Sequence, residues 1–243
     1  MEATTMSDLQ FQGLMVDVPR RFRSFYGRNI DQMLLLLSGE DEAGDVVDVP
    51  RVPMTLKQLL YERVHGENVH DRKLLQDNYV DTACAVISDS SGEVLVGLYS
   101  DPLVKELIHG LNPESRLQDG SLLVGADAYQ EIKENAFVIP SDAVSNLRSS
   151  PFDEQVVREG FWNYIAEGDA ELVRDHLSLV QERRGGSMKN RMGLWVSPNP
   201  GLRLLCARSV GGYYGGGVAY GLHLGYYDGG RLVGVVAPEA PQE

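Results

Sequence analysis

The chain has 243 residues, of which 43% are hydrophobic and 23% charged, and its formal net charge at pH 7 is −13. This composition is ordinary for a folded globular protein and excludes a chain that is disordered over most of its length. The acidity excludes an overall positive field of the kind that binds phosphate backbones, so we do not expect nucleic acid among the partners.

The N-terminal region contains no apolar run long enough to span a membrane. Its longest such run is Met33 to Leu37, five residues, whereas a spanning helix needs about 20. A secretory signal is also not recognised, so we expect a soluble, cytoplasmic protein with no membrane partner. The two cysteines, Cys84 and Cys206, lie among apolar residues and are expected to be buried free thiols.

The first 80 residues are expected to form an irregular or helical flank, or a small subdomain, beside a core domain at 81–238. Residues 8–18 alternate weakly between apolar and polar side chains, which favours one strand. Thr55 follows two prolines and is a typical N-cap. Two helices are predicted in this region, at 29–37 and at 56–64.

The middle of the chain predicts a β-hairpin. The apolar runs at 82–87 and 93–99 are separated by a turn-rich loop of Ser, Asp and Gly. A helix at 103–109 follows, and its start is marked by Asp101 and Pro102. Short strands at 122–124 and 137–139 enclose a helix at 127–134, an order that permits a parallel pair. Two further helices are predicted at 152–166 and 169–184.

The C-terminal part predicts an antiparallel β-meander over residues 193–236. Its last two strands are joined by Asp228-Gly229, which suits a tight two-residue hairpin loop. The predicted strands are 193–197, 202–210, 218–227 and 231–236. The fold class expected for the whole is α+β, with a mainly antiparallel sheet covered on one face by the helices at 103–109, 152–166 and 169–184.

This C-terminal region is rich in glycine and tyrosine. Ten glycines lie between Gly211 and Gly234, and five tyrosines lie within one fifteen-residue span. Glycine in a strand allows another chain or a ligand to approach closely, and tyrosine is a frequent interface anchor. The other interpretation, which the frequency of glycine in strands favours, is that the small residues accommodate a helix packed over the sheet. The residues predicted to bind are Tyr213, Tyr214, His223 and Tyr227.

A basic loop precedes the meander. It contains Arg184, Lys189 and Arg191, which would suit an anionic ligand, although a linker between helix and sheet explains them as well. Basic residues also alternate with aromatics over residues 20–28, a pattern typical of single-stranded nucleic-acid binding. In so acidic a chain, pairing of these residues with its own carboxylates is the favoured interpretation.

Signals for catalysis and for metal binding are weak. Asp89 and Glu93 flank the central hairpin, and with His223 they are the candidates for acid–base chemistry. A nucleophile elbow or a glycine fingerprint followed by a helix does not accompany them. His65, Glu67 and His70 lack the spacing of known metal motifs, so we expect no metal and no cofactor.

Two functions remain open. The first is a non-catalytic binding or assembly protein that uses the Gly/Tyr-rich surface to bind a protein partner or another copy of itself. The alternative is a hydrolase or transferase that acts on a small anionic substrate, with His223 and a hairpin carboxylate as the reacting groups and the loop at 183–191 as an anion clamp. The two differ in whether His223 lies close to a carboxylate.

Overall fold

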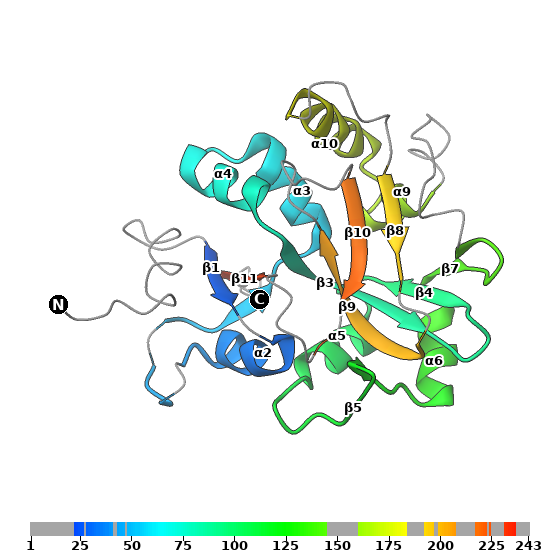
Figure 1. Ribbon diagram of the computed structural model, residues 1–243. Coiled ribbons are helices and arrows are strands. Elements are labelled where there is room, and N and C mark those ends of the chain that lie inside the picture. The colour runs from blue at the N-terminus through cyan, green and yellow to red at the C-terminus, as the bar shows by residue number, and fades with distance from the viewer. Residues whose placement is uncertain are drawn as a thin grey trace, which may run out of the picture.

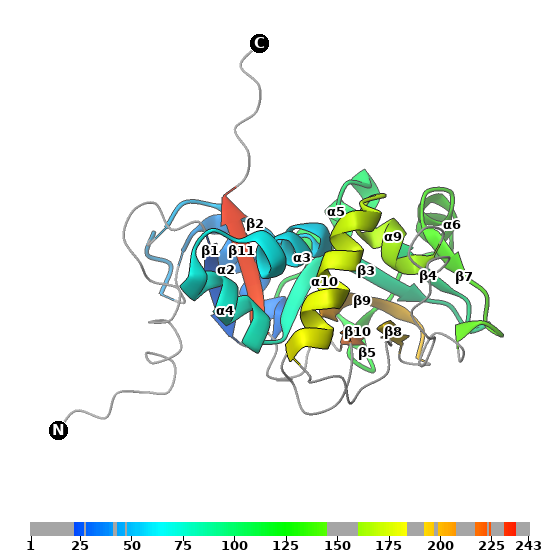
Figure 2. The ribbon, with the colours of Figure 1, turned by 90° about the horizontal axis from the view of Figure 1, so that it is seen from above.

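The protein has an α+β fold in which a mostly antiparallel sheet lies between two groups of helices (Figures 1 and 2). The computed structural model describes residues 22–26, 28–40, 43–46, 48–144, 160–183, 192–196, 199–207, 217–222, 224 and 231–236. The helices are α2 (Asn29–Ser38), α3 (Leu56–His65), α4 (Val69–Asp77), α5 (Pro102–His109), α6 (Ala126–Lys133), α9 (Phe161–Ile165) and α10 (Ala170–Arg183). None of the helices in these ranges is long and apolar enough to cross a membrane.

The sheet is built from strands that come from the whole length of the described chain. They are β1 (Phe22–Tyr26), β2 (Arg51–Pro53), β3 (Val80–Ser88), β4 (Val94–Gly97), β5 (Leu117–Gln118), β6 (Ser121–Leu122), β7 (Phe137–Ile139), β8 (Met192–Trp195), β9 (Gly201–Ala207), β10 (Gly217–Leu222) and β11 (Arg231–Val236). The central order is β1-β11-β3-β9-β10-β8. Among the described strands only β8–β10 and β3–β11 pair in parallel, which confirms the mainly antiparallel α+β class.

Local signals explain where several helices begin and end. Thr55 caps α3 through a capping box with Gln58, as the sequence predicts. Asp101 caps α5, with Pro102 in its first turn. Gly39 ends α2 in the left-handed conformation with φ 77°, where its N–H donates to the Leu35 carbonyl.

The apolar core lies on both faces of the sheet. All residues of β3 are buried, and its side chains alternate: Cys84 and Val86 join a first apolar cluster, whereas Ala85 and Ile87 join a second. The first cluster is covered by α3, α4, α9 and α10, and the second by α2, α5 and α6 (Figure 1). This corrects the expectation that helices cover one face. The continuous apolar run from Ala83 to Ile87 in β3 is typical of a strand that is buried on both sides.

The C-terminal strands occur where they were predicted, but they do not form a meander. β10 pairs with β9 and, in parallel, with β8. β11 leaves its sequence neighbours and pairs with β1, β2 and β3. The turn predicted at Asp228-Gly229 lies outside the described residues, and the strands on either side of it are not neighbours. The reason is burial: Leu232 enters the second apolar cluster and Val233 the first, so β11 is a central strand.

The hairpin predicted in the middle of the chain is confirmed by the pairing of β3 with β4, in which Ser88 lies opposite Val94. The parallel pair that the order of the next two strands would permit does not form. β7 pairs antiparallel with β4, and β6 pairs with β5 and β9.

The strand predicted at 8–18 and the start of the helix predicted at 152 lie outside the described residues. The domain boundary near residue 80 stays a prediction, while β1 and β2 belong to the same sheet as the later strands.

Candidate functional site

The residues predicted to bind a partner all lie outside the part of the chain that the structure describes. They are Tyr213, Tyr214, His223, Tyr227, Arg184, Lys189 and Arg191. The structure does describe the residues between which these segments run. Segment 184–191 leads into Met192, segment 208–216 connects Ala207 to Gly217, and segment 225–230 leads into Arg231.

These attachment points share one end of the sheet. Val80, the first residue of β3, lies opposite Ala207 in β9 and opposite Arg231 in β11. Ala207 in turn lies opposite Ala219, close to the start of β10. Gly217 pairs with Met192, and Figure 1 shows β8 and β10 side by side below α10. Segments far apart in the sequence are therefore anchored at neighbouring strand ends.

The end of α10 is fixed to the same end of the sheet. Arg183, its last residue, donates from Nη1 to Oδ1 of Asp77 at 2.8 Å and from Nη2 to the side chain of Gln76. Both partners belong to the last turn of α4, which leads into β3. The basic segment 184–191 therefore begins from a helix end that is held beside the first residues of β3.

Asp89, one of the catalytic candidates, organises the β3–β4 turn. Its Oδ1 accepts hydrogen bonds from the N–H and hydroxyl of Ser91 at 2.9 and 2.6 Å, and from the Glu93 N–H at 3.0 Å. Burial raises the pKa of the carboxyl, but these hydrogen bonds outweigh that effect and hold the pKa of Asp89 below its ordinary value. The contacts are those expected of Asp in a turn.

Glu93 joins the hairpin to α6. Its Oε1 accepts from Lys133 Nζ at 2.6 Å and from the Tyr129 hydroxyl at 3.1 Å. Burial of the phenol and its hydrogen bond to Glu93 raise the pKa of Tyr129. Both hairpin carboxylates thus have structural contacts. His223 lies outside the described residues, so a catalytic role for these carboxylates stays a prediction.

Cys84 is buried as expected and carries a free thiol. Burial raises its pKa to about 12, because the thiolate is poorly stabilised among apolar neighbours. Its burial and its raised pKa both oppose a nucleophilic role at neutral pH. In the basic and aromatic segment at 20–28, Arg28 donates from Nε and Nη2 to the two carboxylate oxygens of Asp31 at 2.6 and 2.8 Å. This residue thus pairs with a carboxylate of the chain itself, as the sequence analysis favoured for the segment.

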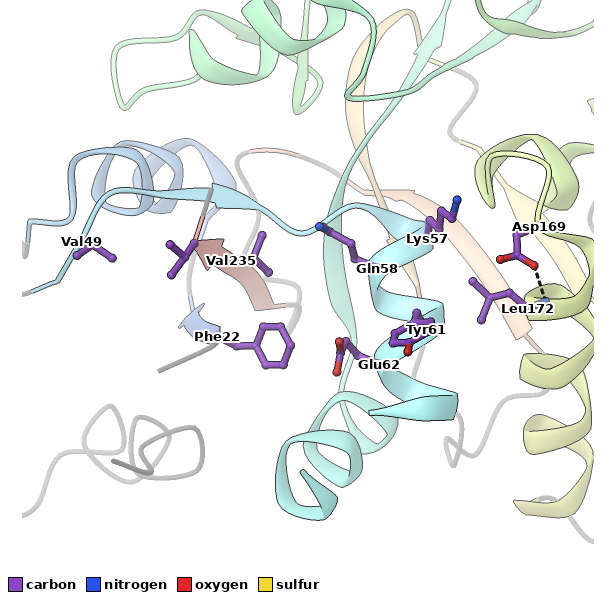
Figure 3. A pocket seen from close by; sticks show the side chains of 10 residues that line it. Phe22, Val49, Lys57, Gln58, Tyr61, Glu62, Asp169, Leu172 and Val235 are labelled. Atoms are coloured by element: carbon purple, nitrogen blue, oxygen red, sulfur yellow. Dashed lines mark hydrogen bonds between the residues drawn. The ribbon is translucent and has the colours of Figure 1, made fainter. Parts of the chain in front are cut away.

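The structure also contains a groove that the sequence analysis missed. Its volume is about 810 Å³, and it lies between β1 and β11 on one side and α3 and the start of α10 on the other (Figure 3). It is lined by Phe22, Val49, Lys57, Gln58, Tyr61, Glu62, Asp169, Leu172, Val235 and Val236. These residues are widely separated in sequence, so only the tertiary fold brings them together.

The groove has an apolar floor and a polar rim. Phe22, Leu172 and Val235 are buried, whereas Tyr61 is 49% exposed. Polar side chains at the rim serve helix ends: Gln58 completes the capping box of α3, and Asp169 accepts from the Leu172 N–H at 3.0 Å. In the residues described, no group of three or more His, Cys, Asp or Glu is arranged to hold a metal ion.

Comparison with protein-family models gives no match, and no curated protein matches at significant similarity. One solved structure does match, from a study of how the C-type lectin fold accommodates massive sequence variation in Nanoarchaeota. The identity is 18%, the match covers 90% of this chain and 100% of the other, and the TM-score is 0.54. At this identity the likeness concerns the fold, and this chain is therefore similar in fold to a protein with the C-type lectin fold.

Proposed function

We propose that this protein is a non-catalytic binding protein that binds a protein partner, or a second copy of itself, through its Gly/Tyr-rich segments. The observation that carries the proposal is the shared end of the sheet. Ala207 and Gly217 bound the first Gly/Tyr-rich segment, Arg231 follows the second, and the strand register holds these three residues next to one another. Leu224, which precedes the second segment, lies away from this end and donates from its N–H to the Gly120 carbonyl oxygen. Met192, which follows the basic segment, belongs to the same end.

The chemistry of these segments fits recognition of another protein. Tyrosine offers a large, stiff surface with a hydroxyl at its tip, so it contributes much binding energy for little entropy loss. Glycine lets a partner's backbone come close. Arg184, Lys189 and Arg191 supply cations for acidic groups on the partner. Binding residues are commonly carried by connecting segments that a rigid scaffold positions.

The fold comparison supports this division between scaffold and binding segments. The similar nanoarchaeal protein is described as having a fold that accommodates massive sequence variation. A fold tolerates such variation where the varied residues lie outside the packed core, because core substitutions create cavities or strain. In this chain the strand residues on both sides of the Gly/Tyr-rich segments, Ala207 and Leu232, are buried.

The test compares two sets of tyrosine variants. A photo-crosslinking residue at position 214 identifies the bound protein, and calorimetry or sedimentation then gives the dissociation constant. The triple variant Tyr213→Ala/Tyr214→Ala/Tyr227→Ala should bind at least about 100-fold more weakly, since interface tyrosines are each worth about 1–2 kcal/mol. Its melting temperature should stay close to that of the unmodified protein.

The matched control is Tyr61→Ala, which removes an exposed tyrosine at the rim of the groove. It should leave the dissociation constant unchanged. If Tyr61→Ala abolishes binding while the triple variant retains it, the groove is the binding site and the proposal is wrong.

A further inference from the structure

Arg203 in β9 is a fully buried cation with few partners. Its exposed fraction is 0%, and its Nη1 donates to the Asn199 carbonyl oxygen at 2.9 Å. Across the described ranges, neither Nε nor Nη2 of this guanidinium has a hydrogen-bond partner. Arg203 lies opposite Val86 of β3, so its side chain is on the sheet face of the first apolar cluster.

Two serines on strands that pair with β9 also have buried polar groups without hydrogen-bond partners among the described residues. The hydroxyls of Ser88 in β3 and Ser121 in β6 are buried and lack a hydrogen-bond partner within the described part of the chain. Ser88 lies opposite Gly201. A Cβ atom on Gly201 would lie 2.6 Å from the Ser121 Cβ, so Ser121 packs directly on this strand. Both serines therefore flank the first residues of β9.

Strand alternation places all three side chains on one face. Leu122 and Leu202 lie opposite each other and both belong to the second apolar cluster. Their neighbours Ser121 and Arg203 consequently point to the other face. Ser88 follows Ile87, a member of the second cluster, and points the same way as Arg203. The guanidinium nitrogens left unpaired by the described residues and the two hydroxyls therefore lie on the same face of the sheet, around the first residues of β9.

The electrostatics of this region are unfavourable as they stand. Burial lowers the pKa of Arg203, and the charge of Asp119 offsets only part of that effect. Arginine nevertheless stays protonated in proteins, so the positive charge must be balanced. Arg63, which is also fully buried, shows the usual solution: it donates to the carbonyl oxygens of Leu75, Asn78 and Ala207. Water would satisfy the N–H groups of Arg203, whereas an anion would satisfy them and also add to the charge compensation that Asp119 supplies in part.

We propose that Arg203, Ser88 and Ser121 bind one small monovalent anion, chloride, in a closed structural site. One cationic group balances one negative charge, and the four donors suit a spherical ion. Arg203 and Ser121 are 0% exposed and Ser88 4%, so a ligand bound there has to be small. Gly201 lacks a side chain at the point where β6 packs on β9, which allows Ser121 to approach.

The first experiment measures thermal unfolding at constant ionic strength while chloride replaces gluconate. The melting temperature should rise with the logarithm of the chloride concentration, by several degrees at 100-fold excess over the dissociation constant. In crystals soaked with bromide, an anomalous peak should lie within about 3.5 Å of Arg203 Nε or Nη2. Equal melting temperatures in both salts together with the absence of that peak would overturn the proposal and leave ordered water as the occupant.

Variants test whether the effect belongs to this site. Arg203→Met should abolish the chloride dependence, whereas Arg72→Met on α4 should keep it. Should Arg203→Met fail to fold, Ser121→Ala provides the second measurement, with a several-fold weaker chloride response in a folded protein. A chloride response that Arg203→Met or Ser121→Ala leaves unchanged places the ion elsewhere and refutes the assignment. Stabilisation by formate or phosphate but not by chloride also refutes it, in favour of an oxyanion.

Discussion

His176 in α10 gives the protein a stability that depends on pH. Its imidazole is buried, and neither ring nitrogen has a hydrogen-bond partner among the residues that the structure describes. Burial lowers its pKa to about 3, and the positive charge of Arg63 acts in the same direction. The folded protein therefore holds this histidine neutral, while the unfolded chain protonates it near its ordinary pKa of about 6.5.

The direction of the effect follows from proton uptake. Between about pH 3 and pH 6.5 the unfolded state binds more protons at this site than the folded state, so the free energy of unfolding increases with pH. Above about pH 6.5 the imidazole is neutral in both states, so His176 does not reduce the free energy of unfolding there. As the pH falls below 6.5, protonation of His176 in the unfolded state progressively lowers the free energy of unfolding. Each pH unit in this window is worth about 1.4 kcal/mol, so lowering the pH from 7.5 to 5.0 should cost about 2 kcal/mol through His176 alone.

The assay is urea unfolding of the native protein and of His176→Leu at both pH values. Other groups also titrate in this range, so the informative quantity is the difference in pH response between the two proteins. The native protein should lose about 2 kcal/mol more than His176→Leu on acidification. If the two proteins respond equally to pH, then His176 is not held neutral by burial and the reasoning fails.

Three further predictions concern caps, glycine conformation and thiol burial. Thr55→Ala should destabilise the protein by about 1 kcal/mol through loss of the α3 cap, whereas Thr55→Ser should cost little; denaturant unfolding of both measures this. Gly39→Ala should cost well over 1 kcal/mol, since a Cβ would lie 2.5 Å from the Asp48 carbonyl oxygen at φ 77°. Gly44 has a φ of 84°, but a Cβ there would have no atom within 4 Å, so Gly44→Ala measures the cost of the backbone conformation alone. If the two variants lose the same stability, the clash inferred at Gly39 is contradicted. Cys84 should resist iodoacetamide at pH 8 in the folded protein and react in urea, as peptide mapping would show; rapid native labelling would contradict its burial.

The elements that the sequence predicted well depend on neighbouring residues. The capped helix after Thr55 and the helix that ends before Gly39 are both confirmed. The central hairpin is confirmed as well, and each of the four C-terminal strands begins within one residue of its predicted start. In each case the informative residues lie within a few positions of the boundary that they determine, as capping and turn chemistry require.

The pairing of β11 could not be predicted in this way. Residues Arg231 to Val236 follow a turn signal that favours a hairpin with the preceding strand. The alternative partners, β1 and β3, are about 200 and 150 positions away along the chain. β11 pairs with β1 and β3 because this pairing buries Leu232 and Val233 on opposite faces of the sheet. The residues next to β11 in sequence do not contain this information.

The same limit applies to the candidate sites. The groove joins Phe22, Tyr61, Leu172 and Val235, which carry no common motif. Arg203 alternates with leucines in β9, a pattern typical of a strand with one face in solvent. Because β9 lies inside the sheet with helices or connections on both sides, the position that alternation assigns to solvent is buried instead.

Polar contacts also hold helices and strands together at the end of the sheet where the Gly/Tyr-rich segments attach. Arg63 on α3 donates from Nε to the Leu75 carbonyl oxygen at 2.9 Å and from Nη2 to that of Ala207 at 3.2 Å. It therefore ties two helices to the last residue of β9, immediately before segment 208–216. Arg183 ties α10 to the same region through Asp77. Since these contacts lie within the scaffold, the proposed function predicts that substitutions in the segments themselves change binding while the strand ends that carry them stay in place.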